Sequence, residues 1–320
     1  MPTQERSGQA APGLGRFFYG GQAVIEGVMM RGRRQYAVAV RLAGGGIRVH
    51  QGRLTAGIYV HPLWKLPFLR GLALLVEQLH LGMRSLIWSA AVNAGEQDVE
   101  IGPREVAIAI AVGSILSLAL FIGLPLLGAG FAVHRSSSFL FVVVEGLIRV
   151  ALVLAYLALI GRMRDVYRLF QYHGAEHKTI NALERGWPLE PASVRRASTL
   201  HPRCGTGFLL VVLVVSVLVF SLVAIAHPNW PLLILSRIVG IPVIAGISYE
   251  WIRLLARFPT HPIARVLLVP ILATQRLTTR EPDDGMLEVA IAALEAARED
   301  EEAARTQATR GQTRLEPEAS

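Results

Sequence analysis

The most prominent pattern along the chain is a set of long apolar runs that begins about one third of the way through it. Each run has roughly the twenty apolar residues that an α-helix needs to cross the hydrocarbon core of a bilayer. The runs extend over residues 106–131, 139–160, 207–226 and 232–255. The pattern therefore predicts an α-helical integral membrane protein with four transmembrane helices in residues 101–280.

A different pattern precedes the spans. Residues 22–30 are a mostly apolar run of strand length, and two further runs, 36–42 and 47–50, flank three consecutive glycines. Two such runs around a glycine turn are typical of a β-hairpin. We therefore expect a small N-terminal antiparallel β unit in residues 17–60, after a disordered segment at residues 1–16 that is polar and rich in glycine and proline.

Amphipathic segments lie on both sides of the spans. Residues 62–92, within the segment 61–100, have leucines at helical spacing interrupted by charged side chains such as Glu77 and Arg84. This spacing predicts a helix that lies along the membrane surface or packs against the bundle. Residues 281–320 predict a second amphipathic helix on the cytoplasmic side, which becomes a disordered charged tail from about Thr306.

Composition agrees with a membrane protein. Of the 320 residues, 52% are hydrophobic and only 18% are charged, whereas soluble domains have about a quarter charged residues. The single cysteine excludes an internal disulfide. The net charge of +8 indicates basic loops held against anionic lipid. The bilayer is therefore the expected partner, and a nucleic acid is not.

The distribution of basic residues predicts the topology. Residues 162–203 contain eight lysines and arginines, whereas the turn at residues 227–230 contains neither. Because basic loops remain on the cytoplasmic side of a membrane, we expect residues 162–203 and both termini to be cytoplasmic.

This basic loop contains the motif His-x-x-Glu-His, formed by His173, Glu176 and His177. On a helix the two histidines are one turn apart, so both imidazoles and the carboxylate project from one face. Two imidazoles at this spacing can hold one metal ion, with zinc as the best match, and the carboxylate can then take a proton from a water on that ion. The order is the inverted form of the zinc-hydrolase signature. The plainer alternative is a solvated helix face, since short patterns recur by chance.

A zinc site needs at least a third protein ligand. His201 is our first choice, followed by Cys204 and by Glu184, which returns to the same helix face as His177. The alternative for Cys204 is a small buried apolar side chain. Glu250 and Glu26 are more distant candidates. Either could be an additional ligand or a residue that hydrogen-bonds to a ligand. For Glu26, an ion pair with Arg31, Arg33 or Arg34, which follow closely in the sequence, is the competing interpretation.

Charged residues also lie well inside two of the spans. Glu145 and Arg149 are at the i,i+4 spacing of an ion pair in the second span, and Arg237 lies in the fourth. Because charges facing lipid are costly, we expect all three to face the bundle interior. They form either a structural ion pair, which we favour, or a polar pocket or ion path.

Four blocks of the sequence carry a family resemblance. Residues 20–31, 170–180, 201–208 and 281–293 resemble the signature blocks of the YqhQ-like family, and the similarity extends over residues 17–294. This is a bacterial family of membrane proteins of unknown function whose members are often labelled metal-dependent enzymes. The resemblance implies a multi-pass protein of the bacterial inner membrane. The enzyme label depends on the same His-x-x-Glu-His motif.

Two functions remain open. The first is a membrane-embedded zinc hydrolase in which Glu176 is the general base and the substrate is a lipid headgroup or a membrane-bound peptide. The second is a non-enzymatic transporter or assembly factor in which the histidines hold a structural ion or form a hydrogen-bonded cluster. We expect His173, His177, His201 and Cys204 to converge with Glu176 from separate segments, because one helix cannot close a tetrahedron.

Overall fold

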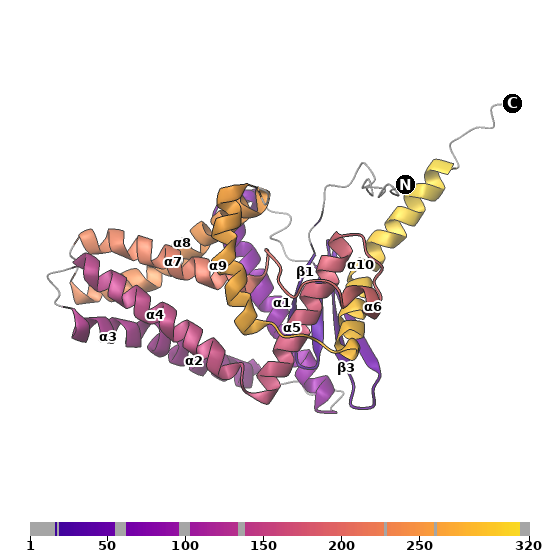
Figure 1. The fold of residues 1–320 in the computed structure, drawn as a ribbon, viewed down its shortest axis with the longest axis horizontal. Coiled ribbons are helices and arrows are strands. Elements are labelled where there is room, and N and C mark those ends of the chain that lie inside the picture. Colours follow the sequence, from indigo (N-terminus) through magenta and orange to yellow (C-terminus); the bar gives the residue numbers. More distant parts are fainter. Residues whose placement is uncertain are drawn as a thin grey trace, which may run out of the picture.

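The computed structural model describes residues 17, 19–54, 62–95, 103–133, 138–226, 229–258 and 261–313. The protein is elongated, with a bundle of long helices at one end and a smaller unit of helices and strands at the other (Figure 1). We call the smaller unit the α/β domain; it comprises the sheet with α5, α6 and α10. The disorder predicted for residues 1–16 falls outside the described residues.

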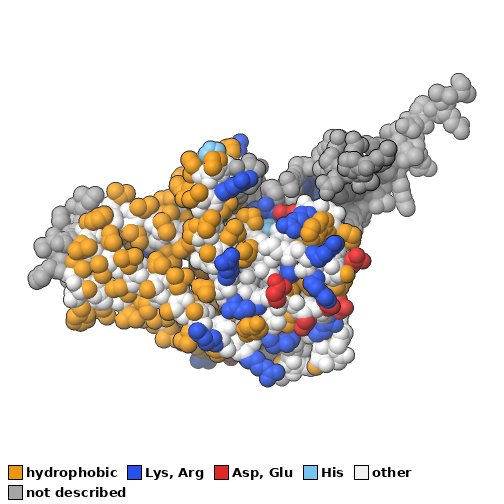
Figure 2. Space-filling model, in the orientation of Figure 1, with side chains coloured by type: hydrophobic (Ala, Val, Ile, Leu, Met, Phe, Trp, Pro, Cys, Tyr) orange, Lys and Arg blue, Asp and Glu red, His pale blue; other side chains and the backbone are white. Residues whose placement is uncertain are grey.

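The bundle confirms the predicted spans. Helices long and apolar enough to cross a membrane cover Ala107–Ala132, Phe139–Ile160, Gly205–Val223 and Ile234–Leu255. The structural elements are α2 (Pro103–Leu118), the π-helical segment η3 (Ala119–Gly123), α3 (Leu124–Ala132), α4 (Ser138–Ile160), α7 (Gly205–Ile225) and α8 (Trp230–Arg257). Figure 2 shows hydrophobic side chains covering this end, while charged side chains gather over the α/β domain.

One helix was missed by the sequence analysis. Helix α9 (Pro262–Thr278) follows the fourth span and buries Leu268 and Ile271 against the bundle, while Val266 and Val269 remain exposed. Pro270 inside the helix and the neighbouring arginines obscured its pattern. The helix leads the chain from the bundle back to the α/β domain (Figure 1).

The β unit is a four-stranded antiparallel sheet in the order β1-β2-β3-β4, which confirms the predicted small antiparallel sheet. Its strands are β1 (Gly20–Val24), β2 (Gly27–Arg31), β3 (Gln35–Arg41) and β4 (Ile47–Arg53). The run at residues 22–30, predicted as one strand, is instead two strands, because Val24 pairs with Gly27 across a tight turn. Glu26 occupies that turn with φ 51°, a conformation uncommon outside glycine.

Both faces of this sheet are covered. Ala37 and Ala39 belong to a core shared with α5 (Arg164–Glu184) and α10 (Asp284–Thr313), whereas Val38 and Val40 belong to a second core shared with α1 (Leu69–Asn93). This double burial explains why β3 is almost continuously apolar instead of alternating. Helix α1 also packs against α8, so it connects the sheet to the bundle.

The C-terminal segment is part of the domain core. Leu287, Ala290, Ala293 and Leu294 of α10 are fully buried against the sheet and α5. The helix continues to Thr313, beyond the position near Thr306 where the sequence predicts disorder; residues 314–320 are outside the described ranges. Helix α10 is therefore an integral part of the α/β domain core. It is not an amphipathic helix that merely lies on a surface.

Candidate metal centre

Helix α5 carries the His-x-x-Glu-His motif across the junction of the bundle and the α/β domain (Figure 1). The helix ends after Glu184, where Gly186 adopts φ 69° and the N–H of Trp187 donates to the carbonyl oxygen of Ala182 at 2.9 Å. This is a glycine-terminated helix end. The chain then turns back along α5 through α6 (Pro191–Val194).

Side chains of α5 fasten this returning segment. The Nζ atom of Lys178 donates to the carbonyl oxygens of Arg195 and Ala197, at 2.8 Å in each case. The Nδ2 atom of Asn181 donates to the carbonyl oxygens of Ser198 at 2.8 Å and Leu200 at 3.1 Å. The backbone at residues 195–200 is thereby fixed beside the histidine face of the helix.

Each histidine of the motif is oriented by a backbone carbonyl. His173 Nδ1 lies 2.8 Å from the carbonyl oxygen of Thr278, and His177 Nδ1 lies 2.5 Å from that of Thr199. A carbonyl oxygen can only accept, so each Nδ1 carries the proton and each neutral ring has its lone pair on Nε2. This is the arrangement by which proteins orient histidine as a metal ligand.

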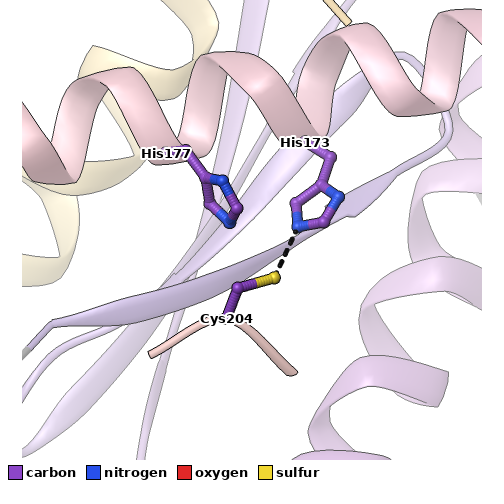
Figure 3. A group of neighbouring side chains, drawn as sticks. All are labelled: His173, His177 and Cys204. Carbon is purple, nitrogen blue, oxygen red and sulfur yellow. Dashed lines mark hydrogen bonds between the residues drawn. The ribbon is translucent and has the colours of Figure 1, made fainter. Parts of the chain in front are cut away.

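The two Nε2 atoms converge on Cys204. His173 Nε2 lies 3.2 Å from the Cys204 sulfur, and ligand atoms of His173, His177 and Cys204 are all within 4.8 Å of one another. Figure 3 shows both rings projecting from one side of α5 toward Cys204. The Nε2 atom of His177 is buried and has no hydrogen-bond partner among the described residues. We call these three side chains the His/Cys cluster.

Cys204 directly precedes α7. The backbone N–H of Thr206 donates to the Cys204 sulfur at 3.4 Å, and the Thr206 hydroxyl is 3.1 Å from the same sulfur. Cys204 is therefore held at the start of α7, and its sulfur is a ligand type that zinc accepts.

Glu176 lies beside the His/Cys cluster. Its Oε2 atom is 3.8 Å from the Nε2 atoms of both His173 and His177. Burial raises the pKa of this carboxyl group, opposed by the nearby histidines and by the backbone N–H of Gly21. Strand β1 packs closely here, because a Cβ on Gly21 would lie 3.1 Å from the Glu176 side chain. The site thus contains a desolvated carboxyl group within reach of anything held by the two rings.

Burial also affects the protonation of His177. Its side chain is only 1% exposed, and this desolvation lowers its pKa, against a raising contribution from Cys204. The imidazole is therefore held neutral, as a metal ligand must be.

His201 was our first choice from sequence for the third ligand. It lies next to the His/Cys cluster but is not one of its three members. Its ring centroid is 5.7 Å from that of His177. Its Nε2 atom lies 3.7 Å from the carboxylate of Glu184, which also forms an ion pair with Arg203. Burial lowers the pKa of His201. The structure brings Cys204, the second choice, to the position beside both Nε2 atoms, and Glu184 faces His201 instead.

The two distant carboxylates are engaged by other groups. Glu250 forms an ion pair with Arg70 of α1 and accepts from the backbone N–H of Phe68 at 3.2 Å. Glu26 forms a two-pronged ion pair with Arg168, which lowers the pKa of the Glu26 carboxyl, and it accepts from the hydroxyl of Tyr172 at 3.3 Å. Neither carboxylate belongs to the His/Cys cluster. Glu26 is thus ion-paired, but its partner is Arg168 of α5, whereas the sequence pointed to the arginines at residues 31–34.

Sequence reasoning missed the groups that hold the segments of the site in place. Gln275 of α9 is fully buried, accepts from the backbone N–H of His201 at 2.9 Å and donates to its carbonyl oxygen at 2.7 Å. Gly174 allows the segment after α9 to cross α5, with the N–H of Arg280 donating to the carbonyl oxygen of Phe170 at 2.9 Å. This crossing positions the carbonyl oxygen of Thr278 at His173. Backbone carbonyls carry no residue-type signal, although a glycine inside a histidine motif indicates a close approach.

Fold and site together define a multi-pass membrane protein whose spans are joined to an α/β domain with a His/Cys cluster at the junction. Residues 66–300 match the family described as "Protein of unknown function (DUF1385)", and the chain belongs to this family. It is also 34% identical, over 293 residues, to the protein named "Uncharacterized protein YqhQ" of Bacillus subtilis (strain 168), with 85% of this chain and 90% of that protein covered. These matches bear out the resemblance to the YqhQ-like family. No solved structure matches the chain.

Proposed function

We propose that the protein is a zinc-dependent membrane enzyme, a hydrolase whose metal is held by His173, His177 and Cys204. The observation that carries the proposal is the orientation of the two imidazoles. Both Nδ1 atoms are occupied by backbone carbonyls, so both Nε2 lone pairs face the cysteine sulfur. This pre-orientation of both rings is typical of metal-binding histidines.

The donor set fits zinc. Two imidazole nitrogens and one thiolate are ligands of a borderline-soft ion, and three protein ligands leave a fourth position open, as in catalytic zinc sites. The unpartnered Nε2 of His177 supports the fit, because a buried acceptor without a partner is costly unless a ligand satisfies it. A zinc ion in this position supplies a Lewis acid and a water activated for attack.

Glu176 is the general base of the proposed reaction. Its Oε2 atom, 3.8 Å from both Nε2 atoms, is close enough to take a proton from a group seated among the three ligands. Burial raises its pKa, which makes the carboxylate a stronger base than an exposed one. Its conversion to an amide removes the base and leaves the three ligands unchanged.

The position of the centre supports a membrane-associated substrate. Cys204 immediately precedes α7, and the apolar window of that span begins at Gly205. The ligands therefore lie at the level where the bundle meets the α/β domain. The arginine-rich character of this end supports a cytoplasmic location in the bacterial inner membrane. We propose the headgroup of a lipid as the substrate, with a membrane-bound peptide as the alternative.

Metal analysis tests the proposal. The full-length protein, purified in detergent, is expected to retain about one zinc per chain, and His173→Ala, His177→Ala and Cys204→Ser are each expected to lose most of it. His80→Ala is the matched control, because His80 is exposed on α1 and lies outside the cluster. Equal metal contents in all five proteins would refute the site.

The second step tests catalysis. Glu176→Gln is expected to bind zinc as the wild type does, and to lose about 10²-fold or more of its zinc-dependent hydrolysis of a micelle-soluble p-nitrophenyl ester. The rate of p-nitrophenol release measures this loss. A Glu176→Gln protein as active as the wild type would contradict the role of general base.

Burial favours one alternative, a structural ion. The side chain of His177 is 1% exposed and that of Glu176 is 6% exposed, which leaves little room for a large substrate. In this second candidate function the metal fastens α5 to the start of α7, and the protein is a transporter or assembly factor. Zinc binding without hydrolysis, together with a loss of thermal stability in Cys204→Ser, would favour it over the enzyme.

A further inference from the structure

A second group of buried polar side chains lies inside the membrane bundle. Glu145 of α4 forms ion pairs with Arg149 of the same helix through one carboxylate oxygen and with Arg237 of α8 through the other. Arg237 and Glu145 are each 1% exposed and Arg149 is 7% exposed. All three face the bundle interior, as the cost of a charge in lipid predicts. We call them the buried charge triad.

The triad is remote from the His/Cys cluster. Glu145 is fifteen residues before Ile160, the last residue of α4 (160 − 145), which corresponds to about 22 Å along the helix. The α5 helix with its histidines begins beyond that end. Any ligand of the triad is therefore independent of the metal centre.

The two arginines of the triad differ in their hydrogen bonds. Arg149 Nε donates to the carbonyl oxygen of Phe121 at 2.9 Å, and its Nη1 donates to the hydroxyl of Ser216 at 3.4 Å. Phe121 lies in η3, where the π-helical backbone departs from regular α-helical hydrogen bonding. Arg149 thus has an acceptor at every one of its nitrogens.

Arg237 lacks such acceptors. Its Nη2 donates to Glu145, but its Nε and Nη1 atoms are buried without a hydrogen-bond partner among the residues that the structure describes. Its guanidinium lies over the Phe220 ring at 3.9 Å from the centroid. A cation–π contact offsets part of the charge, but it leaves the N–H groups of those two nitrogens without an acceptor.

The charges of the triad do not balance. Two guanidinium groups and one carboxylate sum to a net charge of +1 (2 − 1) among side chains that are all at least nine-tenths buried. Arginine does not lose its proton in proteins, so the excess cannot be removed by titration. A buried uncompensated charge is strongly unfavourable, and a bound anion removes both the charge and the missing acceptor.

The helices around the triad are closely packed. A Cβ on Gly240, one turn after Arg237, would lie 2.9 Å from the Phe220 ring, and a Cβ on Gly146 would collide with Val217. The two glycines therefore allow α4, α7 and α8 to approach closely around the triad. Such close packing favours a small ligand over a lipid phosphate with its glycerol.

From the unpartnered N–H groups of Arg237 and the excess positive charge, we infer that the bundle binds one small inorganic monovalent anion, of the halide class, against Arg237. The anion accepts from Nε or Nη1 and neutralises the triad. The Arg237 guanidinium of α8 is already stacked on Phe220 of α7. An anion that holds this guanidinium in place therefore also stabilises the contact between α7 and α8. The bundle is therefore expected to be more stable in chloride than in a large organic anion.

Chloride binding to the wild-type protein tests this directly. The full-length protein in neutral detergent is dialysed against radiolabelled chloride at constant ionic strength, with gluconate as the replacement. Saturable binding that is competed by bromide is expected, together with a thermal unfolding midpoint that rises with chloride concentration as linkage requires. Absence of saturable binding to the wild type would overturn the inference, whatever the variants do.

Two variants locate the site. Arg237→Gln is expected to abolish saturable binding, whereas Arg265→Gln, on the exposed surface of α9, is the matched control and should bind as the wild type does. Glu145→Gln removes the competing carboxylate, so it is expected to tighten chloride binding by about tenfold or more. Unchanged binding in Arg237→Gln, or weaker binding in a folded Glu145→Gln, would overturn the assignment to the triad.

Discussion

Gly174 is expected to control metal affinity at the proposed centre, although it is not one of the proposed ligands. A Cβ at this position would lie 3.2 Å from the carbonyl carbon of Arg280 and 3.5 Å from Cδ of Pro282, and it would collide with the Arg280 carbonyl oxygen. Because this neighbour is backbone, it cannot rotate away as a side chain does. Gly174→Ala therefore forces the crossing segment to move by on the order of 1 Å to restore normal carbon–oxygen contact.

The displaced segment carries the carbonyl oxygen that orients His173. The hydrogen bond from His173 Nδ1 to Thr278 is 2.8 Å long, and a shift of ~1 Å takes it beyond the range of a hydrogen bond. Loss of such a supporting contact typically lowers metal affinity by about 10- to 100-fold. The clash itself is expected to destabilise the fold by about 1–3 kcal/mol, which exceeds the ~1 kcal/mol that alanine gains over glycine within a helix.

Zinc affinity measured by competition with a chromophoric chelator, together with thermal unfolding, tests this prediction. Gly113→Ala is the control, because a Cβ there meets nothing within 4 Å, so only the helix-propensity gain should appear. A Gly174→Ala protein with wild-type zinc affinity and raised stability would refute the proposed coupling between the crossing segment and the site.

Three further predictions concern the rest of the molecule. Arg168 holds the pKa of the Glu26 carboxyl below its ordinary value of 4.5, so the pair stabilises the fold above that pH and the effect is lost as pH falls through the lowered pKa. Glu26→Gln should therefore destabilise by about 1 kcal/mol or less near neutral pH, since both groups are partly exposed. In urea titrations the difference from wild type should shrink as the pH is lowered below 4.5, and a difference that does not change with pH would contradict this. Chelation should lower the unfolding temperature, with recovery on adding zinc and not magnesium; recovery with magnesium would argue against a nitrogen–sulfur site. A cysteine introduced at Asn229 should react with an impermeant maleimide on intact cells and one at Ala192 should not, and the reverse pattern would overturn the proposed orientation.

The long apolar runs of the sequence predicted the membrane-spanning helices well. The spans depend only on runs of apolar residues, and lipid imposes that length on any helix that crosses it. The β3–β4 hairpin was equally predictable, since Gly45 has φ 89° in its turn and glycine marks such turns. The β1–β2 turn was not, because Ile25 and Glu26 form it and Glu26, which is not a glycine, occupies the positive-φ position.

The candidate site was predictable only in part. Helix periodicity alone places His173 and His177 on one face. Whether His201 or Cys204 supplies the third ligand depends on the path of the chain into α7. The two residues are only three apart, so the sequence does not show which of them faces the histidines of α5. The carbonyl oxygens of Thr199 and Thr278 come from backbone folded next to α5, and backbone has the same chemistry in every residue. These contacts arise from tertiary packing and leave no local pattern in the sequence.

The most direct test of the central claim is X-ray absorption at the zinc edge of the purified, zinc-loaded protein. The proposed site predicts nitrogen ligands at about 2.0 Å and one sulfur ligand at about 2.3 Å. It also predicts that Cys204→Ser removes the sulfur contribution and that His201→Ala retains it. A spectrum with no sulfur ligand in the wild type, or one that is unchanged in Cys204→Ser, would contradict the assignment of the His/Cys cluster as the metal centre.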